Sequence, residues 1–328
     1  MVAPFLVEGW ANKLQVVAAI SNPRRYRTRY DLYLDFRKHM ADSGVVLWTA
    51  EAAFGERSFA VTRADHPYDF QFRTTSEIWH KEDLINLAAQ RLPHDWQYIA
   101  WIDADVHFIR TDWAEEAVHM LQHHPVIQLW TDAMDMTPSH EPLVRHKGFA
   151  WCFHHLKPDP DCDPYKPPRP GPHWIPWHPG FAWAMRRDAY EIVGGLIDHA
   201  ICGAADNHMA KGIIGDAGYS MHPKIQGTYR RWVMQWQTRA LAAFQKDMGY
   251  VHGLLTHAWH GQKRHRRYWD RWQILVKNAF DPELDLRRDR QGLWALTDRS
   301  PRLRDDMRRY FMERHEDSID VNPSEGNM

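Results

Sequence analysis

Apolar and polar positions change their spacing in a regular way along the first third of the chain. The run KLQVVAAIS, residues 13–21, is apolar at its centre and is followed by the turn residues Asn22 and Pro23, which predicts a buried strand. Residues 27–44 place apolar side chains at helical spacing and end at Gly44, which predicts an amphipathic helix. A second strand is predicted at residues 45–50. This order of elements indicates a parallel sheet.

The alternation of strand and helix continues to about residue 113. We expect a third strand at residues 58–64, a helix over residues 76–92 capped by Ser76, and a strand within WQYIAWID, residues 96–103. The pattern predicts an α/β fold with a doubly wound, mostly parallel sheet flanked by helices. In such sheets, ligands bind beyond the carboxyl ends of the strands.

Composition narrows the class of protein. The chain has 328 residues, 44% of them hydrophobic, which is enough for a sizeable core. No apolar run approaches the roughly 18 residues of a membrane helix, and the amino terminus lacks a basic region, so we expect no membrane segment. Cys152, Cys162 and Cys202 form no metal-binding pattern, and their odd number favours a reducing, cytoplasmic location.

Two aspartates, Asp103 and Asp105, follow the strand YIAWI. Residues two apart point to the same side of an extended chain, so the two carboxylates converge. Carboxylates this close repel each other unless a cation lies beside them, and Mg²⁺ or Mn²⁺ with diphosphate oxygens is a common solution. An acidic turn that caps the next element is the alternative.

Two later stretches also carry candidate chemistry. GAADNHMAKGI, residues 203–213, places Asp206 at the start of a helix, where an acid can also be a simple cap. LLTHAWHGQKRHRRYWDRW, residues 254–272, contains His257 and His260, followed by Lys263 and Arg264. Imidazoles can ligate a metal and basic side chains can bind phosphate, although a solvated basic segment has the same composition.

Taken together, the motifs resemble a known family. WHKEDLINLAAQRLP, IAWIDADVHF, VIQLWTDAMD and HPGFAWAMRRDAYEIVGGL, with the late HAWHG, are similar to galactosyltransferase-like members of the metal-dependent glycosyltransferases of the GT-A fold. The resemblance covers roughly residues 14–275. It implies one glycosyltransferase domain at residues 1–280, with a nucleotide-binding half (1–113) and an acceptor half (114–280). Residues 281–328 are then a charged extension, expected to be partly helical or disordered.

The resemblance also implies roles for individual residues. Asp103 and Asp105 match the Asp-x-Asp motif that holds Mn²⁺ or Mg²⁺ on a nucleoside-diphosphate sugar, most simply a UDP-sugar, and one of them commonly contacts the ribose or the sugar. His257 or His260 matches the late metal ligand. Asp206 matches the base of inverting members, but Ala204 and Ala205 stand where the family usually has a further acid or glycines.

Further candidates follow from position along the chain. The donor nucleotide is expected to meet Ser21, Asn22 and Arg27 after the first strand, and Lys81 and Asn86 on the following helix. Lys263 and Arg264 would offset the charge of the leaving diphosphate. For the acceptor side we expect contacts from Trp177, Trp183 and Asn207, at and beyond the end of a proline-rich segment, residues 137–180, that we interpret as an acceptor-side loop.

The acceptor itself stays open at this stage. Between residues 224 and 272, basic residues outnumber acidic ones and are interleaved with Tyr and Trp, a composition suited to nucleic acid, although the net charge of the chain is -1. The acceptor is then a saccharide, another small molecule or a hydroxymethylated pyrimidine in DNA.

Three other classes of function compete. A nucleotidyltransferase that makes sugar nucleotides would normally have a glycine-rich loop after the first strand, and AISNPRRY has none. A metallohydrolase is suggested by the 22 histidines, but no His-Glu-x-x-His or Cys-x-x-Cys spacing is present. A sugar-binding module could use the 17 tryptophans, but it would not need converging aspartates and a late histidine.

Overall fold

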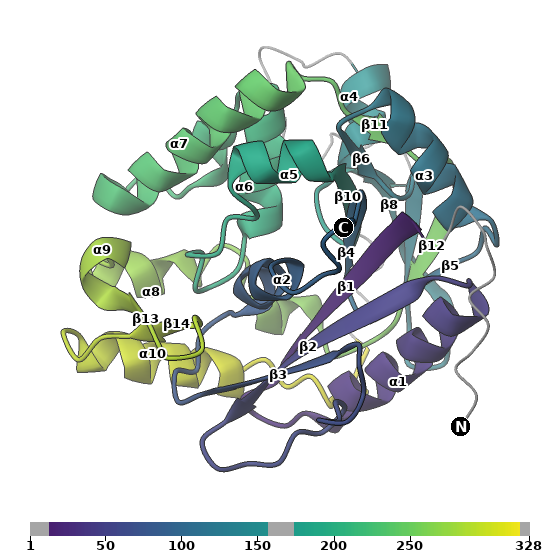
Figure 1. The fold of residues 1–328 in the computed structure, drawn as a ribbon. Helices are drawn as coiled ribbons and strands as arrows, with labels where there is room; N and C mark the ends of the chain where they lie inside the picture. The colour runs from purple at the N-terminus through teal and green to yellow at the C-terminus, as the bar shows by residue number, and fades with distance from the viewer. Residues whose placement is uncertain (1–12, 157–173, 322–328) are drawn as a thin grey trace.

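A seven-stranded sheet forms the centre of the molecule (Figure 1), in a computed structural model that describes residues 13–156 and 174–321. Its strand order is β11-β6-β10-β4-β1-β2-β3. The first four strands along the chain pair in parallel. These strands are β1 (Leu14–Ser21), β2 (Val46–Phe54), β3 (Asp69–Thr74) and β4 (Tyr98–Ile102).

The other half of this sheet contains its one antiparallel strand. Strand β10 (Ala182–Arg186) runs antiparallel to both neighbours, β4 and β6 (Val126–Gln128). Strand β11 (Gly249–Tyr250) then pairs in parallel with β6. The sheet is therefore mostly parallel, as predicted.

Helices cover both faces of the sheet, because successive side chains of each strand point to opposite faces. In β1, Val16 and Ala18 belong to a core cluster with Phe36 of one helix group, whereas Val17 belongs to a cluster with Leu84 of the other. The first group is α1 (Arg27–Asp42) and α3 (Trp113–His123). The second is α2 (Lys81–Ala89), α5 (Arg187–Val193), α6 (Ala205–Ile214) and α7 (Gly227–Phe244). The predicted fold class, an α/β fold with a mostly parallel sheet flanked by helices, is confirmed by this topology.

A second sheet, which the sequence did not predict, lies beside the first with the order β5-β12-β7-β8-β9. Its strands are β5 (Val106–Phe108), β7 (Asp132–Met136), β8 (Pro142–Gly148), β9 (Ile175–His178) and β12 (Leu254–His257). Strands β8 and β9, with α4 (Phe149–His155) between them, lie in the proline-rich segment that we interpreted as a loop. The expectation of a loop is therefore wrong for these residues, and residues 157–173 lie outside the described part of the chain.

The C-terminal segments pack onto the domain. Leu303, Met307, Tyr310 and Phe311 of α10 (Pro301–Met312) are buried in the same core cluster as residues of α2, α6 and α7. The remaining elements are η2 (Ala217–Ser220), η3 (Lys263–Arg266), α8 (Trp272–Lys277), α9 (Pro282–Asp285), β13 (Leu286–Arg288) and β14 (Trp294–Leu296). The expected domain boundary at residue 280 stays a prediction.

Two local expectations are wrong. Residues 58–64 form no strand, because the buried Glu51 carboxylate accepts hydrogen bonds from the backbone N–H groups of Ala60, Val61 and Thr62. Ser76 does not cap α2, which begins at Lys81; its hydroxyl instead accepts a hydrogen bond from the backbone N–H of Leu296. In both places a polar group is satisfied by a partner that local sequence patterns do not reveal.

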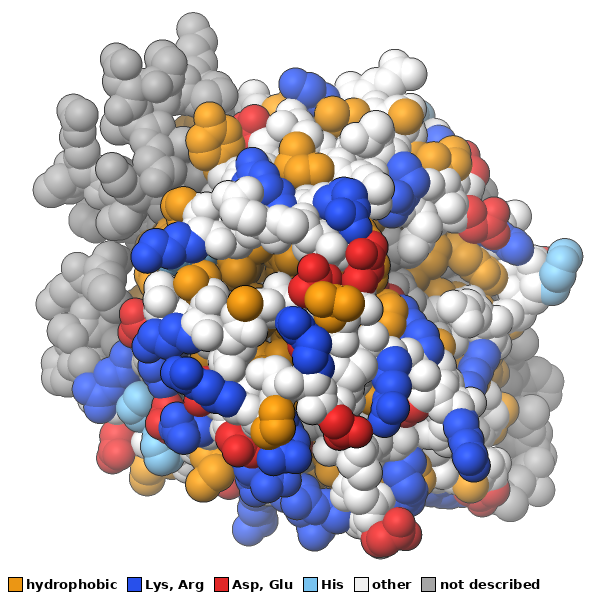
Figure 2. Space-filling view, turned by 90° about the vertical axis from the view of Figure 1, so that its left-hand side faces the viewer, with side chains coloured by type: hydrophobic (Ala, Val, Ile, Leu, Met, Phe, Trp, Pro, Cys, Tyr) orange, Lys and Arg blue, Asp and Glu red, His pale blue; other side chains and the backbone are white. Residues whose placement is uncertain are grey.

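The surface carries both signs of charge. On the face drawn in Figure 2, Lys and Arg side chains are scattered among apolar and uncharged areas, with Asp and Glu side chains between them. No helix among residues 13–156 and 174–321 is long and apolar enough to cross a membrane.

Candidate functional site

Asp105 lies at the junction of the two sheets. Strand β4 ends at Ile102, and the chain turns through Asp103, Ala104 and Asp105 into β5. The backbone fixes this turn at both ends, because the N–H of Asp103 donates to the Phe181 carbonyl (2.7 Å) and the N–H of Ala258 donates to the Asp105 carbonyl (2.8 Å). The second bond places Asp105 beside the end of β12.

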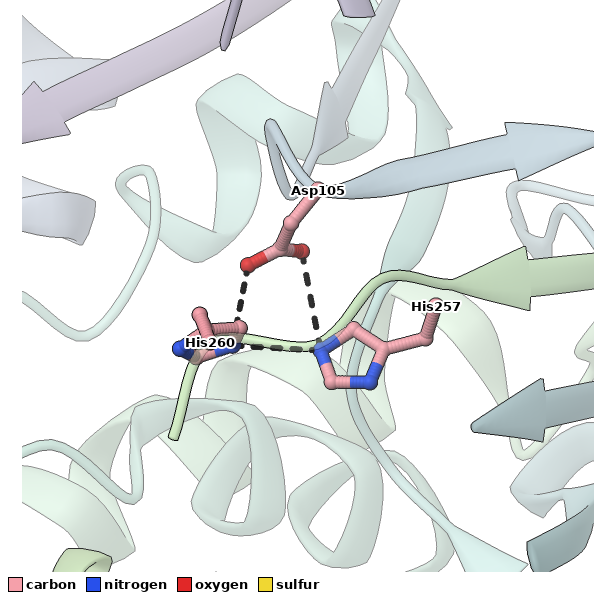
Figure 3. A group of neighbouring side chains, drawn as sticks. All are labelled: Asp105, His257 and His260. Atoms are coloured by element: carbon pink, nitrogen blue, oxygen red, sulfur yellow. Dashed lines mark hydrogen bonds and ion pairs between the residues drawn. The ribbon is translucent and has the colours of Figure 1, made fainter. Parts of the chain in front are cut away.

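Asp105 meets two histidines from the late part of the chain (Figure 3). His257 is the last residue of β12, and His260 follows three residues later. One ligand atom from each of the three side chains lies within 4.8 Å of the others. The Nε2 of His260 is 3.2 Å from the Oδ2 of Asp105, and the Nε2 of His257 is 3.8 Å from its Oδ1. We call these three residues the triad; all three are at least 95% buried.

The protonation of the triad suits a divalent cation. Burial opposes ionisation of Asp105, but the two histidines and Arg29, at 2.7 Å, hold its pKa well below the ordinary value. Burial and the neighbouring Arg266 and Arg29 lower the pKa of His260 to about 3, so its imidazole is neutral. Metal ligands must be deprotonated, and the ionised carboxylate of Asp105 and the neutral imidazole of His260 meet that condition.

Asp135 of β7 orients one of these ligands. Its carboxylate accepts a hydrogen bond from the Nδ1 of His257 (2.7 Å) and is bonded to the Nε2 of His146 (2.6 Å) and the Nζ of Lys263. Burial raises the pKa of Asp135, but Lys263 and the two histidines outweigh it and hold the pKa well below the ordinary value. An ionised carboxylate only accepts, so the proton of His257 lies on Nδ1 and the lone pair of its Nε2 faces the triad.

One further observation supports a cation at the triad. The Oδ1 of Asp105 is buried and has no hydrogen-bond partner among the described residues. A buried, ionised oxygen without a partner is costly unless a ligand satisfies it. The residues of the triad therefore fit a bound divalent ion, and two nitrogen donors beside one carboxylate suit Mn²⁺ better than Mg²⁺.

The triad opens into a cavity of about 1370 Å³. Eleven of the residues that we singled out from the sequence line it: Ser21, Asn22, Lys81, Asp103, Asp105, Trp177, Asp206, Asn207, His257, His260 and Lys263. They come from the ends of β1 and β4, from the first turns of α2 and α6, from β9, and from the segment after β12. The cavity thus lies where an α/β sheet is expected to bind its ligand.

Asp103 and Asp105 have different partners. The Asp103 carboxylate forms an ion pair with Lys81 of α2 and is not part of the triad. Burial and the nearby charge of Asp105 raise the pKa of Asp103, and Lys81 opposes them. The role of Asp103 as a metal ligand stays a prediction.

Asp206 lies on the wall of the cavity in the first turn of α6. Its Oδ1 accepts a hydrogen bond from the backbone N–H of Asn207 (2.8 Å). Gly180 allows the carboxylate to approach the chain closely, because a Cβ there would lie 3.1 Å from the Asp206 Oδ2. The Oδ2 of Asp206 accepts no hydrogen bond from Asn207 or Gly180.

Four predicted residues do not line the cavity. Arg27 is exposed and pairs with Asp31, and Arg264 is exposed on η3. Trp183 is buried in β10, where its Nε1 donates to the Pro179 carbonyl (2.8 Å). Asn86 holds the loop after α5, because its Oδ1 accepts from the N–H of Leu196 (2.8 Å) and its Nδ2 donates to the Leu196 carbonyl (2.9 Å). The structure gives these four side chains other contacts.

Two of the predicted residues that do line the cavity also hold the local backbone. Asn22 bonds the backbone N–H and carbonyl of Tyr26 through its side chain, which closes the loop after β1. Trp177 has a positive φ of 61° and packs edge-on against Phe149.

Sequence reasoning missed several residues of the site. Arg29 contacts the triad, Asp135 and His146 lie behind it, and Glu82 lies on the cavity wall. Asp135 lies in the motif VIQLWTDAMD, which carried part of the resemblance, but nothing in the sequence indicates that it pairs with His257 across 122 positions.

Comparison with known proteins gives distant similarities. No protein-family model and no curated protein matches the chain. Two structures of Drosophila β1,4-galactosyltransferase 7 are similar over 63% and 62% of this chain, with identities of 14% and 12% and TM-scores of 0.31 and 0.33. The first is a complex with xylobiose, and the second is a mutant with manganese, UDP-Gal and xylobiose. This chain spans 62% of the length of each.

A glycosyltransferase involved in glycosylation of the major capsid of PBCV-1 is similar over 91% of this chain and 98% of its own, with 10% identity and a TM-score of 0.30. These proteins are of the class that the sequence motifs resemble. Similarity at these TM-scores does not assign a function, which has to rest on the chain's own residues.

Proposed function

We propose that this protein is a metal-dependent glycosyltransferase that moves a sugar from a nucleoside-diphosphate sugar to an acceptor hydroxyl. The observation that carries the proposal is the cavity at the carboxyl ends of the strands. It joins a triad suited to a divalent cation, Asp105 with His257 and His260, to the carboxylate of Asp206, whose Oδ2 has no hydrogen-bond partner among the described residues.

The donor diphosphate is proposed to lie beside the triad. A divalent cation, preferably Mn²⁺, would offset the negative charge of the departing diphosphate. Lys263 and Arg266 line the same part of the cavity and add positive charge there. Ser21, whose Oγ is buried and unbonded among the described residues, lies at the end of β1, where a hydroxyl of the nucleotide could satisfy it.

The transfer step is assigned to Asp206. Its Oδ2 accepts the proton of the acceptor hydroxyl while that oxygen attacks the anomeric carbon of the donor sugar. The bond from the anomeric carbon to the diphosphate oxygen breaks on the opposite side, so the sugar is transferred with inversion. A positioned general base contributes about 10² to 10⁴ to such a rate.

The acceptor side of the cavity is proposed to include Tyr219 and Trp269. Both rings line the cavity and are 76% exposed, which is unusual for large aromatic side chains. Flat faces of this kind stack on sugars and on nucleic-acid bases. They fit a saccharide, another ring-containing small molecule or a hydroxymethylated pyrimidine in DNA.

A thermal-stability screen tests the proposal. Uridine and other nucleoside-diphosphate sugars are added with and without Mn²⁺, and the best donor is then incubated with saccharides and with hydroxymethylated DNA while the mass of each acceptor is followed. We expect stabilisation that needs both the metal and the nucleotide, and one hexose added to one acceptor class. A sugar-binding module would ignore the metal, a hydrolase would ignore the nucleotide, and a nucleotidyltransferase would release pyrophosphate from a nucleoside triphosphate.

Asp206→Asn separates binding from transfer. This variant keeps the shape of the side chain but cannot take up the proton, so we expect unchanged affinity for the donor and a loss of transfer of about 10²-fold or more. Asp216→Asn, just beyond the other end of α6, is the matched control and should transfer at the wild-type rate. Normal turnover by Asp206→Asn would remove Asp206 as the base.

A further inference from the structure

Glu82 is a largely buried acidic residue whose carboxyl group has no partner in the described part of the chain. It is the second residue of α2, lines the cavity and is 4% exposed. Within residues 13–156 and 174–321, its carboxylate forms no hydrogen bond to another residue and no ion pair within 4.0 Å. Its oxygens are not among the buried polar atoms that lack a partner, so they open onto the cavity, where a ligand can bond them.

The next residue of the same helix shows the contrast. Asp83 is 1% exposed, and its carboxylate forms an ion pair with Arg288 and accepts a hydrogen bond from the backbone N–H of Trp294 (2.7 Å). Asp83 therefore has a structural role, because it links α2 to strands β13 and β14. Glu82 faces the cavity instead and has no such role.

Glu82 lies close enough to both Asp206 and Asp103 for their charges to act on it. Burial raises the pKa of Glu82 to about 7. The charge of Lys81 lowers this pKa, whereas the carboxylates of Asp206 and Asp103 raise it. Lys81 is already paired with Asp103 on the triad side. A carboxyl group that titrates near neutral pH can both donate and accept hydrogen bonds, which is what a sugar hydroxyl requires.

The geometry of the transfer step determines which part of the substrate lies next to Glu82. For in-line attack, the anomeric carbon must lie between the diphosphate at the triad and the base at Asp206. The ring of the transferred sugar therefore lies in the part of the cavity that Glu82 faces. Resting on the proposed function, we infer that Glu82 hydrogen-bonds a hydroxyl of the transferred sugar and so helps to select which sugar is accepted.

The test compares a nucleotide with its sugar conjugate. Binding of UDP, UDP-glucose and UDP-galactose in the presence of Mn²⁺ is measured by calorimetry for the wild type, Glu82→Ala and Glu82→Gln. We expect Glu82→Ala to bind UDP like the wild type but to lose about tenfold or more in affinity for the preferred UDP-sugar, because a site built around a hydroxyl discriminates strongly. Glu82→Gln, which keeps a donor and an acceptor, should recover part of this loss.

Specificity gives a readout that a structural role would not change. The wild type should prefer one of the two epimeric sugars, and Glu82→Ala should bind them with similar affinity. The melting temperature of each variant without ligand shows whether it is folded, and Glu82→Gln serves as the conservative variant if Glu82→Ala is unstable.

Several outcomes would contradict the inference: equal weakening of UDP and UDP-sugars, an unchanged sugar preference in Glu82→Ala, a change only in the acceptor KM, or a wild type that binds UDP as tightly as both UDP-sugars. These results leave the proposed function intact as long as UDP binding depends on Mn²⁺. If UDP binding to the wild type ignores Mn²⁺, the proposed function itself is wrong.

Discussion

Two aspartates from one short turn have different environments, because the partner of each comes from a different part of the chain. Asp105 faces histidines from the end of β12, whereas Asp103 faces Lys81 at the start of α2. The same residue type therefore serves a candidate cation site in one case and a salt bridge in the other. Side-chain identity and spacing predicted that both carboxylates would lie near the ligand. They did not predict that Asp105 would face the histidines and Asp103 would face Lys81.

At the residue scale, Asp135 is not a member of the triad, but we expect it to control the affinity of the triad for Mn²⁺. Asp135→Asn removes the ionised acceptor that fixes the tautomer of His257, so we expect affinity for Mn²⁺ to fall about 10- to 100-fold. Asp132→Asn on the same strand is the matched control, because Asp132 pairs with Arg145 and Lys147 away from the triad. Titration with Mn²⁺ measures both variants, and equal losses in the two would show that the effect is not specific to His257.

At the element scale, the loop between α5 and α6 depends on a neutral histidine. His199 is 5% exposed and packs edge-on against Tyr229 and Trp232 of α7, with ring distances of 5.1 and 5.2 Å. Burial lowers its pKa to about 4. In the unfolded chain the pKa of His199 is near 6.5, so between pH 4 and pH 6.5 the unfolded state binds more protons than the folded state. The stability that the neutral His199 contributes is therefore present above pH 6.5 and is lost as the pH falls toward 4.

The size of this effect can be measured. His199 alone is expected to reduce the free energy of unfolding by about 2 kcal/mol between pH 7 and pH 5. His199→Gln does not titrate, so its unfolding free energy should fall less steeply over this range in denaturant titrations. The exposed His94→Gln is the control and should follow the wild type; parallel curves for all three proteins would contradict the assignment.

At the scale of the whole molecule, the C-terminal helix is expected to be part of the folding unit. Met307 of α10 is completely buried in the main core cluster, whereas Met312 of the same helix is 53% exposed. Met307→Ala should lower the free energy of unfolding by about 2 to 5 kcal/mol, because it leaves a cavity. Met312→Ala should change it by less than about 0.5 kcal/mol. Similar, small effects of both in a single unfolding transition would show that α10 is not integrated with the core.

The sequence predicted the parts of the fold that depend on local periodicity. Strands β1, β2 and β4, with helices α1 and α6, follow directly from runs of apolar residues and from their spacing. The third strand was misplaced because the backbone groups of residues 60–62 bond to Glu51, a contact that no local pattern reveals. The second sheet was missed because its strands are short and come from segments far apart in the chain.

The same limit applies to the candidate site. His257 and His260 could be singled out by residue type, but only the pairing of β12 with β5 and β7 brings both to Asp105 and sets Asp135 behind His257. Nothing in the sequence distinguished Glu82, which is seen to face the cavity only once α2 is packed against it. Non-local contacts thus decide which of the chemically suitable side chains meet.

The most direct test of the central claim is the thermodynamic coupling between Mn²⁺ and UDP. Calorimetric titration of UDP at increasing Mn²⁺ concentrations gives this coupling, and Asp65→Asn, with a 76% exposed side chain, controls for the loss of a carboxylate. We predict that Mn²⁺ tightens UDP binding at least about tenfold in the wild type and in Asp65→Asn, and that Asp105→Asn removes this effect while remaining folded. UDP affinity that is the same with and without Mn²⁺, or coupling that survives in Asp105→Asn, would contradict a cation held by Asp105, His257 and His260.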